Sequence, residues 1–237
     1  MENYPTGVIR IRGIMGWCHI LHDQDTCILL DTGMAGEPAF VERALRKIGR
    51  SWKDVDGILL THGHLDHGGN LARFQELSGA PVYGHRMEQL HLDGKYPYEG
   101  KAVWCGRLER WGSALFRYRP GVITDFIQDG QVLPFWGGLK VVHTPGHTAG
   151  HCAFYNESQD VLFSGDLFAS YFFNTHFPPA ILNSCPDLLP SSFLKVVALD
   201  PKWIVPNHHD FADGPLHKRR FLHLCSKLGI LPDKIAA

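Results

Sequence analysis

The sequence lacks the features that mark secreted disulfide scaffolds and membrane proteins. Its six cysteines stand singly, with no CxxC pair, which argues against a dense disulfide framework and favours free thiols. No apolar run reaches the length of a membrane span, and the opening MENYPTGVIRIRG has no basic region followed by an apolar core. We therefore expect a cytoplasmic protein.

The chain also lacks an excess of charge of either sign. Lys and Arg number 23 against 24 Asp and Glu, for a formal charge of -1, so composition gives no general attraction to nucleic acid or acidic membranes. We expect a small-molecule partner, no nucleic acid and no membrane, and leave a homo-oligomer open. With 237 residues and no repeat or linker, the chain is expected to form one domain, residues 1–237.

Short apolar runs rich in β-branched residues predict strands. They cover residues 8–12, 26–30, 57–61, 139–144, 151–155, 161–164 and 203–206. Amphipathic patterns predict helices over 37–49 and 70–79, and a third that begins near Ser191 and Ser192, which we expect to cap it. The alternation of strands and helices predicts a mixed α/β fold.

Residues 86–120 interrupt this alternation. Trp104, Leu108, Trp111 and Leu115 recur there at helical spacing. We expect an amphipathic helix that packs on the body of the protein through this apolar face. The alternative is a helical insertion that caps the active site and brings its Trp and Tyr side chains to the substrate.

What the chain has in abundance is histidine, with 15 residues. Three histidines and an aspartate fall within six positions of THGHLDHGGN at 61–70, namely His62, His64, Asp66 and His67. Imidazole and carboxylate are usual ligands of divalent cations. His62 and His64 alternate across a Gly-containing turn, whereas Asp66 and His67 enter the following helix, so the stretch can serve two ions rather than enclose one.

Five of the apolar runs end in a residue that can bind metal or hold a ligand: Asp31, His62, His147, Asp166 and His208. Strands of one sheet that end at one edge would bring these side chains into a single pocket. The sequence therefore predicts a metal site at such an edge.

The motif His-x-His-x-Asp-His at 62–67, with LLDTG before it and TPGHT, SGD and VPNH after it, resembles the metallo-β-lactamase superfamily of metal-dependent hydrolases. The resemblance implies a four-layer αβ/βα sandwich with a dinuclear site at one edge. It implies that Asp31 orients the ligands from behind. It also implies two ligand sets joined by a bridging carboxylate: His62, His64 and His147 on one ion, Asp66, His67 and His208 on the other, and Asp166 between them.

The sequence departs from the family at the end of the last motif. Asn207 stands where the family usually has Gly, and His209 where it often has Gly again. Neighbouring residues of a strand point in opposite directions, so one of His208 and His209 should reach the metal. The VP-x-H pattern selects His208 and leaves His209 as the alternative.

Two further residues are weighed against known branches of the family. Cys185 is expected to be structural, because Asp166 holds the bridging position that a cysteine takes in the antibiotic-degrading branch. Tyr171 is a candidate for a substrate contact, as a tyrosine is in the lactonase branch, although its spacing favours a core aromatic.

The resemblance also sets the expected chemistry. Zinc is the expected ion, with iron or manganese as alternatives, because an N/O ligand set does not choose strongly among them. Two cations about 3.5 to 4 Å apart can share a water and present it as hydroxide, and Asp66 can pass a proton to the leaving group. We expect hydrolysis of a small-molecule ester, thioester or lactone.

The run TPGHTAGHCAFY followed by VLFSGDLF looks most like glyoxalase II. Only 29 residues follow His208, too few for the helical extension that binds glutathione in that enzyme. A glutathione thioester is therefore not the favoured substrate.

Three alternatives stay open. A persulfide dioxygenase of the same fold uses one iron held by two histidines and an aspartate. A ribonuclease Z-like nuclease needs a basic footprint, which this chain lacks outside HKRR at 217–220. A non-catalytic metal-binding protein could have kept the fold.

Overall fold

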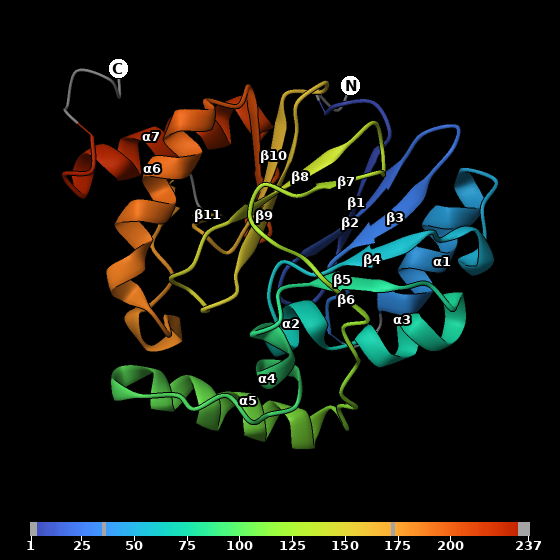
Figure 1. Ribbon diagram of the computed structural model, residues 1–237, viewed down its shortest axis with the longest axis horizontal. Helices are drawn as coiled ribbons and strands as arrows, with labels where there is room; N and C mark the ends of the chain where they lie inside the picture. Colours follow the sequence, from blue (N-terminus) through green and yellow to red (C-terminus); the bar gives the residue numbers. More distant parts are fainter. Residues whose placement is uncertain (1–3, 35–36, 172–173, 232–237) are drawn as a thin grey trace.

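In the computed structural model, which describes residues 4–34, 37–171 and 174–231, two β-sheets pack face to face (Figure 1). The first sheet has the order β1 (Val8–Arg12), β2 (Trp17–His22), β3 (Cys27–Leu30), β4 (Gly57–Leu59), β5 (Val82–Gly84), β6 (Asp125–Phe126). The second has the order β13 (Trp203–Pro206), β10 (Val161–Gly165), β9 (Cys152–Asn156), β8 (Leu139–His143), β7 (Val132–Leu133). A separate two-stranded sheet pairs β11 (Ala169–Tyr171) with β12 (Asn174–His176) in antiparallel direction.

Strand direction brings several chain segments to one edge. Strands β3, β4, β5 and β6 run parallel to one another, and β10 runs parallel to β13. Parallel strands end at the same edge of their sheet, so the residues that follow them are gathered there. This arrangement supplies the loops of the functional site.

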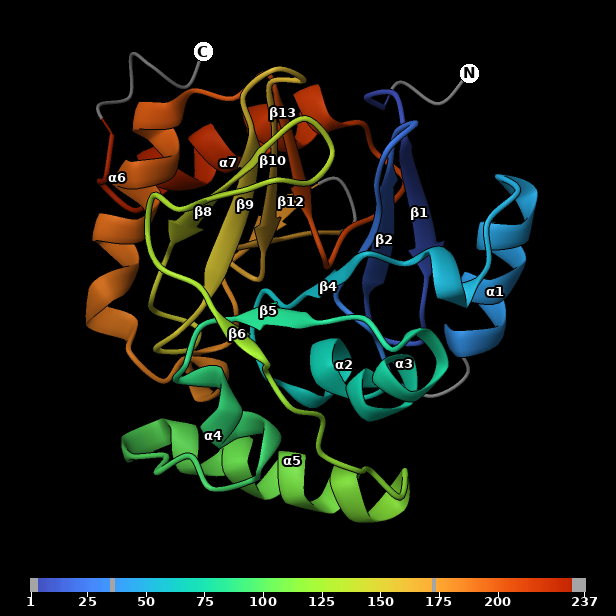
Figure 2. The ribbon, with the colours of Figure 1, turned by 45° about the vertical axis from the view of Figure 1, so that its right-hand side comes forward.

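Helices cover the outer faces of both sheets (Figure 2). On the first sheet, α1 (Glu37–Lys47) and α3 (Leu71–Ser78) bury Val41, Leu45 and Phe74. On the second, α6 (Leu189–Leu199) and α7 (Gly214–Lys227) bury Phe193 and Phe221. A third apolar layer fills the space between the sheets, which confirms the predicted four-layer αβ/βα sandwich.

Three further helices lie at the end of the sandwich where the strand-end loops gather, at the bottom of Figures 1 and 2. They are α2 (Leu65–Gly68), α4 (Glu88–Leu92) and α5 (Val103–Leu115). Single 3₁₀ turns occur at Trp52–Asp54, Gly100–Ala102, Ala180–Leu182 and Pro186–Leu188.

The prediction for residues 86–120 is right about an amphipathic helix, which is α5, and wrong about the face that packs. Trp104, Leu108, Trp111 and Leu115 are 56%, 54%, 67% and 58% exposed, and α5 instead turns Cys105 and Gly112 inward. Spacing shows which residues share a face of a helix, but only the surrounding structure decides whether that face meets the core or solvent.

The predicted third helix is α6, but the expected capping by Ser191 and Ser192 is wrong. The helix begins at Leu189, and its N-cap residue makes no side-chain capping bond. The hydroxyls of Ser191 and Ser192 instead donate to the carbonyls of Leu188 and Pro145. Pro190 near the first helical position, where a missing N–H costs nothing, explains the earlier start.

The cysteines are free thiols, as the sequence predicts. Five of the six are buried. Among the helices that the structure describes, none combines the length and apolar content needed to span a bilayer.

Candidate metal centre

The five strand-end residues and their motif neighbours meet at one place. Asp31 follows β3, His62 follows β4, and Asp166 directly follows β10. Ligand atoms of three overlapping groups lie within 4.8 Å of one another: His62, His64 and His147; His62, His67 and Asp166; Asp66, His67 and His208. All seven side chains that the sequence assigned to metal are therefore brought together.

The first group consists of three buried histidines. Nδ1 of His64 lies 3.0 Å from Nε2 of His147. Nε2 of His62 is buried and has no hydrogen-bond partner among the described residues. Such a nitrogen is costly to leave unpaired unless it has a ligand to bind. The Nε2 atoms of His62 and His147 and the Nδ1 atom of His64 are therefore placed to bind one metal ion.

The second group combines two histidines with a carboxylate. Nε2 of His208 lies 3.2 Å from Oδ2 of Asp66 and 3.3 Å from Nε2 of His67. The Asp66 side chain is 22% exposed, against 1% for His67. Asp66 is thus the member of this group that solvent or a substrate reaches most easily.

Asp166 lies between the two groups. Its Oδ2 is 3.1 Å from Nε2 of His208 and 3.6 Å from Nε2 of His147, while its Oδ1 is 3.2 Å from Nε2 of His67. The backbone N–H of Asp166 donates to Nε2 of the buried His151, which helps to hold the loop. One carboxylate thereby touches both histidine groups, as a bridging ligand would.

The structure separates His208 from His209. His208 points into the centre, and its Nδ1 contacts the carbonyl of Met15 in the β1–β2 loop at 3.0 Å. His209 points away and stacks on Trp17 at 4.8 Å between ring centroids. His208 is therefore the residue that can serve as the last ligand, as the VP-x-H pattern predicts.

Asp31 anchors the centre from behind. Its Oδ2 lies 3.0 Å from Nδ1 of His67, and it accepts hydrogen bonds from Oγ1 of Thr61 and Nδ2 of Asn207. The residue adopts a positive φ of 56°, an uncommon conformation for an aspartate that a network of this kind can hold. Asp31 thus orients the His67 ring directly. Through Thr61 and Asn207 it also holds the loops that carry His62 and His208.

The buried carboxylates of the centre favour positive charge beside them. Burial opposes charge on His67 and His208, yet the facing carboxylates, Asp166 first, raise the pKa of both histidines well above the ordinary value. Burial and neighbouring imidazoles hold the pKa of His62 and His64 well below it. Divalent cations bound by neutral imidazoles would supply this positive charge in place of the protons on His67 and His208.

Glu88 of α4 supports the centre, although the sequence analysis did not single it out. Its fully buried carboxylate accepts from the backbone N–H of Gly63 at 2.7 Å and of Gly150 at 2.8 Å. A Cβ on Gly150 would come within 2.6 Å of this carboxylate. Burial raises the pKa of Glu88 to about 7, against the lowering effect of its hydrogen bonds. Glu88 ties the His62–His64 turn to the loop after His147.

Two more contacts were missed because they come from distant loops. Oδ1 of Asn183 lies 3.2 Å from Nδ1 of His147, and Sγ of Cys105 lies 3.6 Å from Nε2 of His64. Each contacts the ring nitrogen of its histidine that points away from the other ligands. A hydrogen-bond partner at that nitrogen determines which tautomer the ligand adopts. No local pattern around Asn183 or Cys105 signals this role.

Two residues were weighed against known branches of the family, Cys185 and Tyr171. Cys185 lies near the hydroxyl of Tyr96, with 3.9 Å between Sγ and Oη, and belongs to none of the three ligand groups. Tyr171 is the last residue of β11, and its side chain lies outside the described part of the structure.

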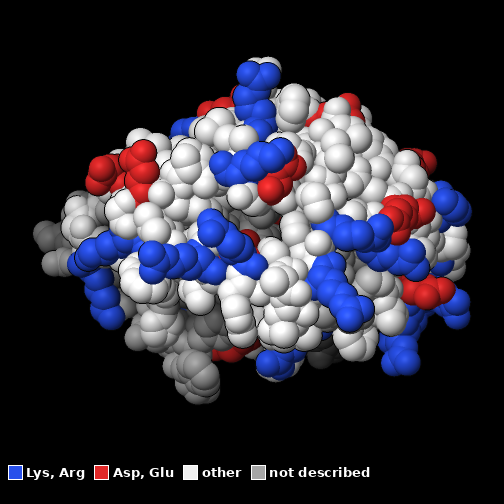
Figure 3. Space-filling model, turned by 90° about the horizontal axis from the view of Figure 1, so that it is seen from below, with Lys and Arg blue, Asp and Glu red and all other residues white. Residues whose placement is uncertain are grey.

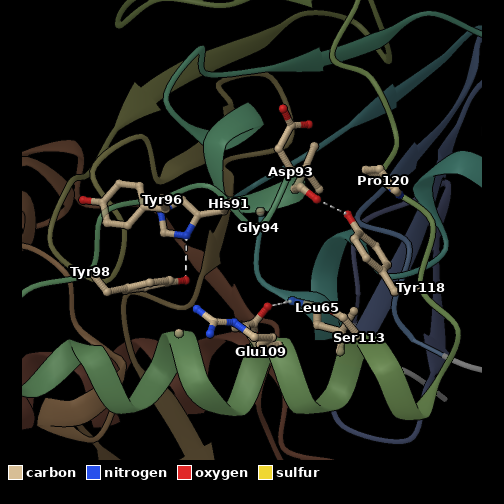
Figure 4. A pocket seen from close by; sticks show the side chains of 14 residues that line it. Leu65, His91, Asp93, Gly94, Tyr96, Tyr98, Glu109, Ser113, Tyr118 and Pro120 are labelled. Carbon is tan, nitrogen blue, oxygen red and sulfur yellow. Dashed lines mark hydrogen bonds between the residues drawn. The ribbon is translucent and has the colours of Figure 1, made fainter.

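A pocket of about 310 Å³ opens between α4 and α5, beside the turn that carries His64 (Figure 4). At one end of the pocket the hydroxyl of Tyr98 bonds Nδ1 of His91, and at the other Tyr118 donates to the carbonyl of Leu92. Glu109 of α5 accepts from the backbone N–H of Leu65. The predicted insertion therefore contacts the metal-binding turn, while its role as a cap over substrate stays a prediction.

Comparison with known proteins agrees with this geometry. Residues 11–209 match the family model of the metallo-beta-lactamase superfamily. The probable metallo-hydrolase YflN of Bacillus subtilis is 29% identical over 202 residues, 76% of this chain and 74% of its own length. The hydroxyacylglutathione hydrolase GloC of Haemophilus influenzae is 28% identical over 166 residues, 67% of this chain and 69% of its own.

Solved structures show the same fold. The crystal structure of TTHA1623 in a di-iron-bound form superimposes with a TM-score of 0.68 at 24% identity, covering 92% of this chain and 98% of that one. The family match covers most of the chain, including every motif from Asp31 to His208. The chain belongs to the metallo-beta-lactamase superfamily of metal-dependent hydrolases.

Proposed function

We propose that this protein is a dinuclear metal-dependent hydrolase that cleaves an ester, thioester or lactone of a small molecule. The observation that carries the proposal is the position of Asp166, whose carboxylate lies within 3.1 to 3.6 Å of histidines from both ligand groups. The first ion would be held by His62, His64 and His147, and the second by Asp66, His67 and His208. Asp166 would bridge them.

The residues present fit two divalent cations. Nε2 of His62 is buried and unpaired among the described residues, and each group supplies three donors of the nitrogen and oxygen types that zinc, iron and manganese accept. We favour zinc. The di-iron form of TTHA1623 keeps iron as an alternative.

When bound, two such cations activate water for attack and polarise the carbonyl oxygen of the substrate. The Asp66 side chain, the most exposed carboxylate of the centre, would accept the proton of the attacking water and then release it to the leaving group. Asp31 keeps the His67 ring in place through its hydrogen bond to Nδ1. Glu88 holds the turn before His64 through the N–H of Gly63, and Asn183 holds the His147 ring through Nδ1.

The proposed substrate class rests on one relative and on the residue at the bridging position. GloC is a hydroxyacylglutathione hydrolase, which supports a thioester among the candidates. A carboxylate rather than a cysteine lies between the two ligand groups, which disfavours the antibiotic-degrading branch. The bond cleaved is therefore proposed to be an ester, thioester or lactone, with specificity set by the loops around α4 and α5.

The test is elemental analysis of the purified protein by mass spectrometry, followed by an ester, thioester and lactone panel with the metal-loaded enzyme. Close to two zinc ions per chain and turnover of one panel class are expected. A single iron per chain with oxygen-dependent sulfur oxidation would replace the proposal with a persulfide dioxygenase. Two bound metals without turnover of any class would favour a non-catalytic metal-binding protein.

A further inference from the structure

The outward face of α5 carries an exposed apolar stripe. We call Trp104, Leu108, Trp111 and Leu115 the α5 stripe; each is more than half exposed, and their spacing of four, three and four residues aligns them along one side of the helix. Contiguous exposed apolar surface of this kind marks an interaction site on a protein. Nothing in the described structure covers it.

Positive charge lies beside the α5 stripe. Lys101, Arg107, Arg110 and Arg117 are exposed, and none of them forms an ion pair with a described residue. The guanidinium of Arg107 lies over the Trp104 ring, 4.6 Å from its centroid. Figure 3 views this end of the molecule from below and shows Lys and Arg side chains across it, with fewer Asp and Glu.

The local charge differs from that of the chain as a whole. Residues 93–119 contain six Lys and Arg against three Asp and Glu, within a chain of net charge -1. Two of these cations are paired, Lys95 with Asp93 and Arg119 with Glu76, and Glu109 is turned inward to the N–H of Leu65. Four cations and the exposed Glu99 are left on this face. The whole-chain balance, which predicts no attraction to acidic membranes, hides a basic face around the α5 stripe.

We propose that this face docks on a phospholipid bilayer with anionic headgroups. Trp and Leu side chains enter the headgroup and upper acyl region without needing directional partners, while flanking Arg side chains pair with lipid phosphates. The helix lies in the plane of the interface rather than crossing it. A cytoplasmic location, as predicted from the sequence, presents the protein to the anionic leaflet of a membrane.

The charge pattern of this face favours an anionic bilayer over two other binding partners, a second copy of the chain and a nucleic acid. A second copy of the chain would bring two sets of unpaired cations together across the same stripe, which opposes association. Nucleic acid favours a basic line along its phosphates, whereas here the centre of the face is apolar and the charges lie at its side. The docking proposal rests on this surface and does not depend on the proposed hydrolase activity.

The experiment is co-sedimentation of the full chain with phosphatidylcholine vesicles, prepared with and without phosphatidylglycerol, at low and high salt. Binding is expected only with phosphatidylglycerol and should weaken with salt. The double variant Trp104→Ala with Trp111→Ala should lose binding about tenfold or more, and Arg107→Glu with Arg110→Glu should abolish the dependence on phosphatidylglycerol. These side chains are exposed, so circular dichroism and metal content should not change.

A matched control is the double variant Phe40→Ala with Val132→Ala, whose side chains are also exposed but lie on α1 and β7. It should bind as the parent protein does. Equal binding to both vesicle types, or full binding by the tryptophan variant, would overturn the proposal. So would a doubled mass in light scattering that the tryptophan variant restores to one chain, because the stripe would then hold a second copy.

Discussion

Asn207 donates a hydrogen bond from Nδ2 to Oδ2 of Asp31 at 2.7 Å, joining the end of β13 to the end of β3. The same amide group donates to the carbonyl of Trp17. The residue that departs from the family's usual glycine is therefore part of the network behind the metal centre. It fixes the backbone one position before His208.

Replacement of Asn207 should weaken both the fold and the second ligand group. Asn207→Ala leaves one acceptor site of a buried carboxylate unpaired, which should lower the free energy of unfolding by about 1–3 kcal/mol. Urea unfolding at pH 7.5 measures this, and zinc titration should show weaker binding of one ion. Gln159→Ala, at an exposed position, is the control. An unchanged unfolding midpoint for Asn207→Ala would contradict the role of the network.

The contrast between His208 and His209 offers a test of the ligand assignment. His208→Ala should reduce the bound metal by about one ion per chain, because His208 lies in the second group. His209→Leu should keep both ions, since His209 packs against Trp17 instead. Metal content by mass spectrometry decides between them. Loss of metal from the His209 variant alone would reverse the assignment.

Glu88 should act on metal affinity without contacting the ions. In Glu88→Gln one of the two backbone N–H groups, of Gly63 or Gly150, would face an amide NH₂ instead of an acceptor. Because the two loops carry ligands, we expect zinc affinity to fall about 10- to 100-fold, as is typical for outer partners of metal ligands. Competition with a chelating dye measures this. Glu42→Gln, on the exposed face of α1, should leave affinity unchanged.

Asp66 should be needed for the rate more than for substrate binding. Asp66→Asn keeps the shape of the side chain but removes the base that is proposed to move a proton. A loss in kcat of about 10²- to 10⁴-fold is expected with little change in KM, as for removal of a general acid or base. Steady-state kinetics at saturating zinc measures both. A change confined to KM would show that Asp66 only helps to bind substrate.

His19 gives the fold a pH dependence that is separate from the metal centre. Both ring nitrogens are buried without a hydrogen-bond partner among the described residues, and burial, with Arg10 nearby, lowers the pKa of His19 to about 3. The unfolded chain takes up a proton at the ordinary pKa near 6.5, so the contribution of His19 to stability is complete above that pH and is lost as pH falls from there toward 3.

His19→Leu should therefore flatten the acid side of the stability profile. Between pH 7.5 and pH 5.0 the parent protein should lose about 2 kcal/mol more than the variant. Urea unfolding at both values in EDTA measures the difference, and the titration of the metal ligands cancels because both proteins share it. Equal losses in the two proteins would mean that His19 is not neutral in the folded state.

The family, the fold class and the set of candidate ligands could all be predicted from the sequence. This was possible because the relevant signals are local: His62 to His67 stand within one turn and helix start, and polar residues directly follow apolar strands. Since strands and their ends are written in short stretches of chain, the order of motifs was enough to predict the four-layer sandwich.

Features that depend on contacts between distant segments of the chain became visible only in the folded structure. Glu88 and Asn183 reach the centre from α4 and from the loop before α6, and no pattern in their own neighbourhoods indicates it. The same holds for the α5 stripe, since periodicity shows that four apolar side chains share a face but not what lies opposite. Which way a face or a side chain turns is set by packing against residues far away in the sequence, and that packing exists only in the folded chain.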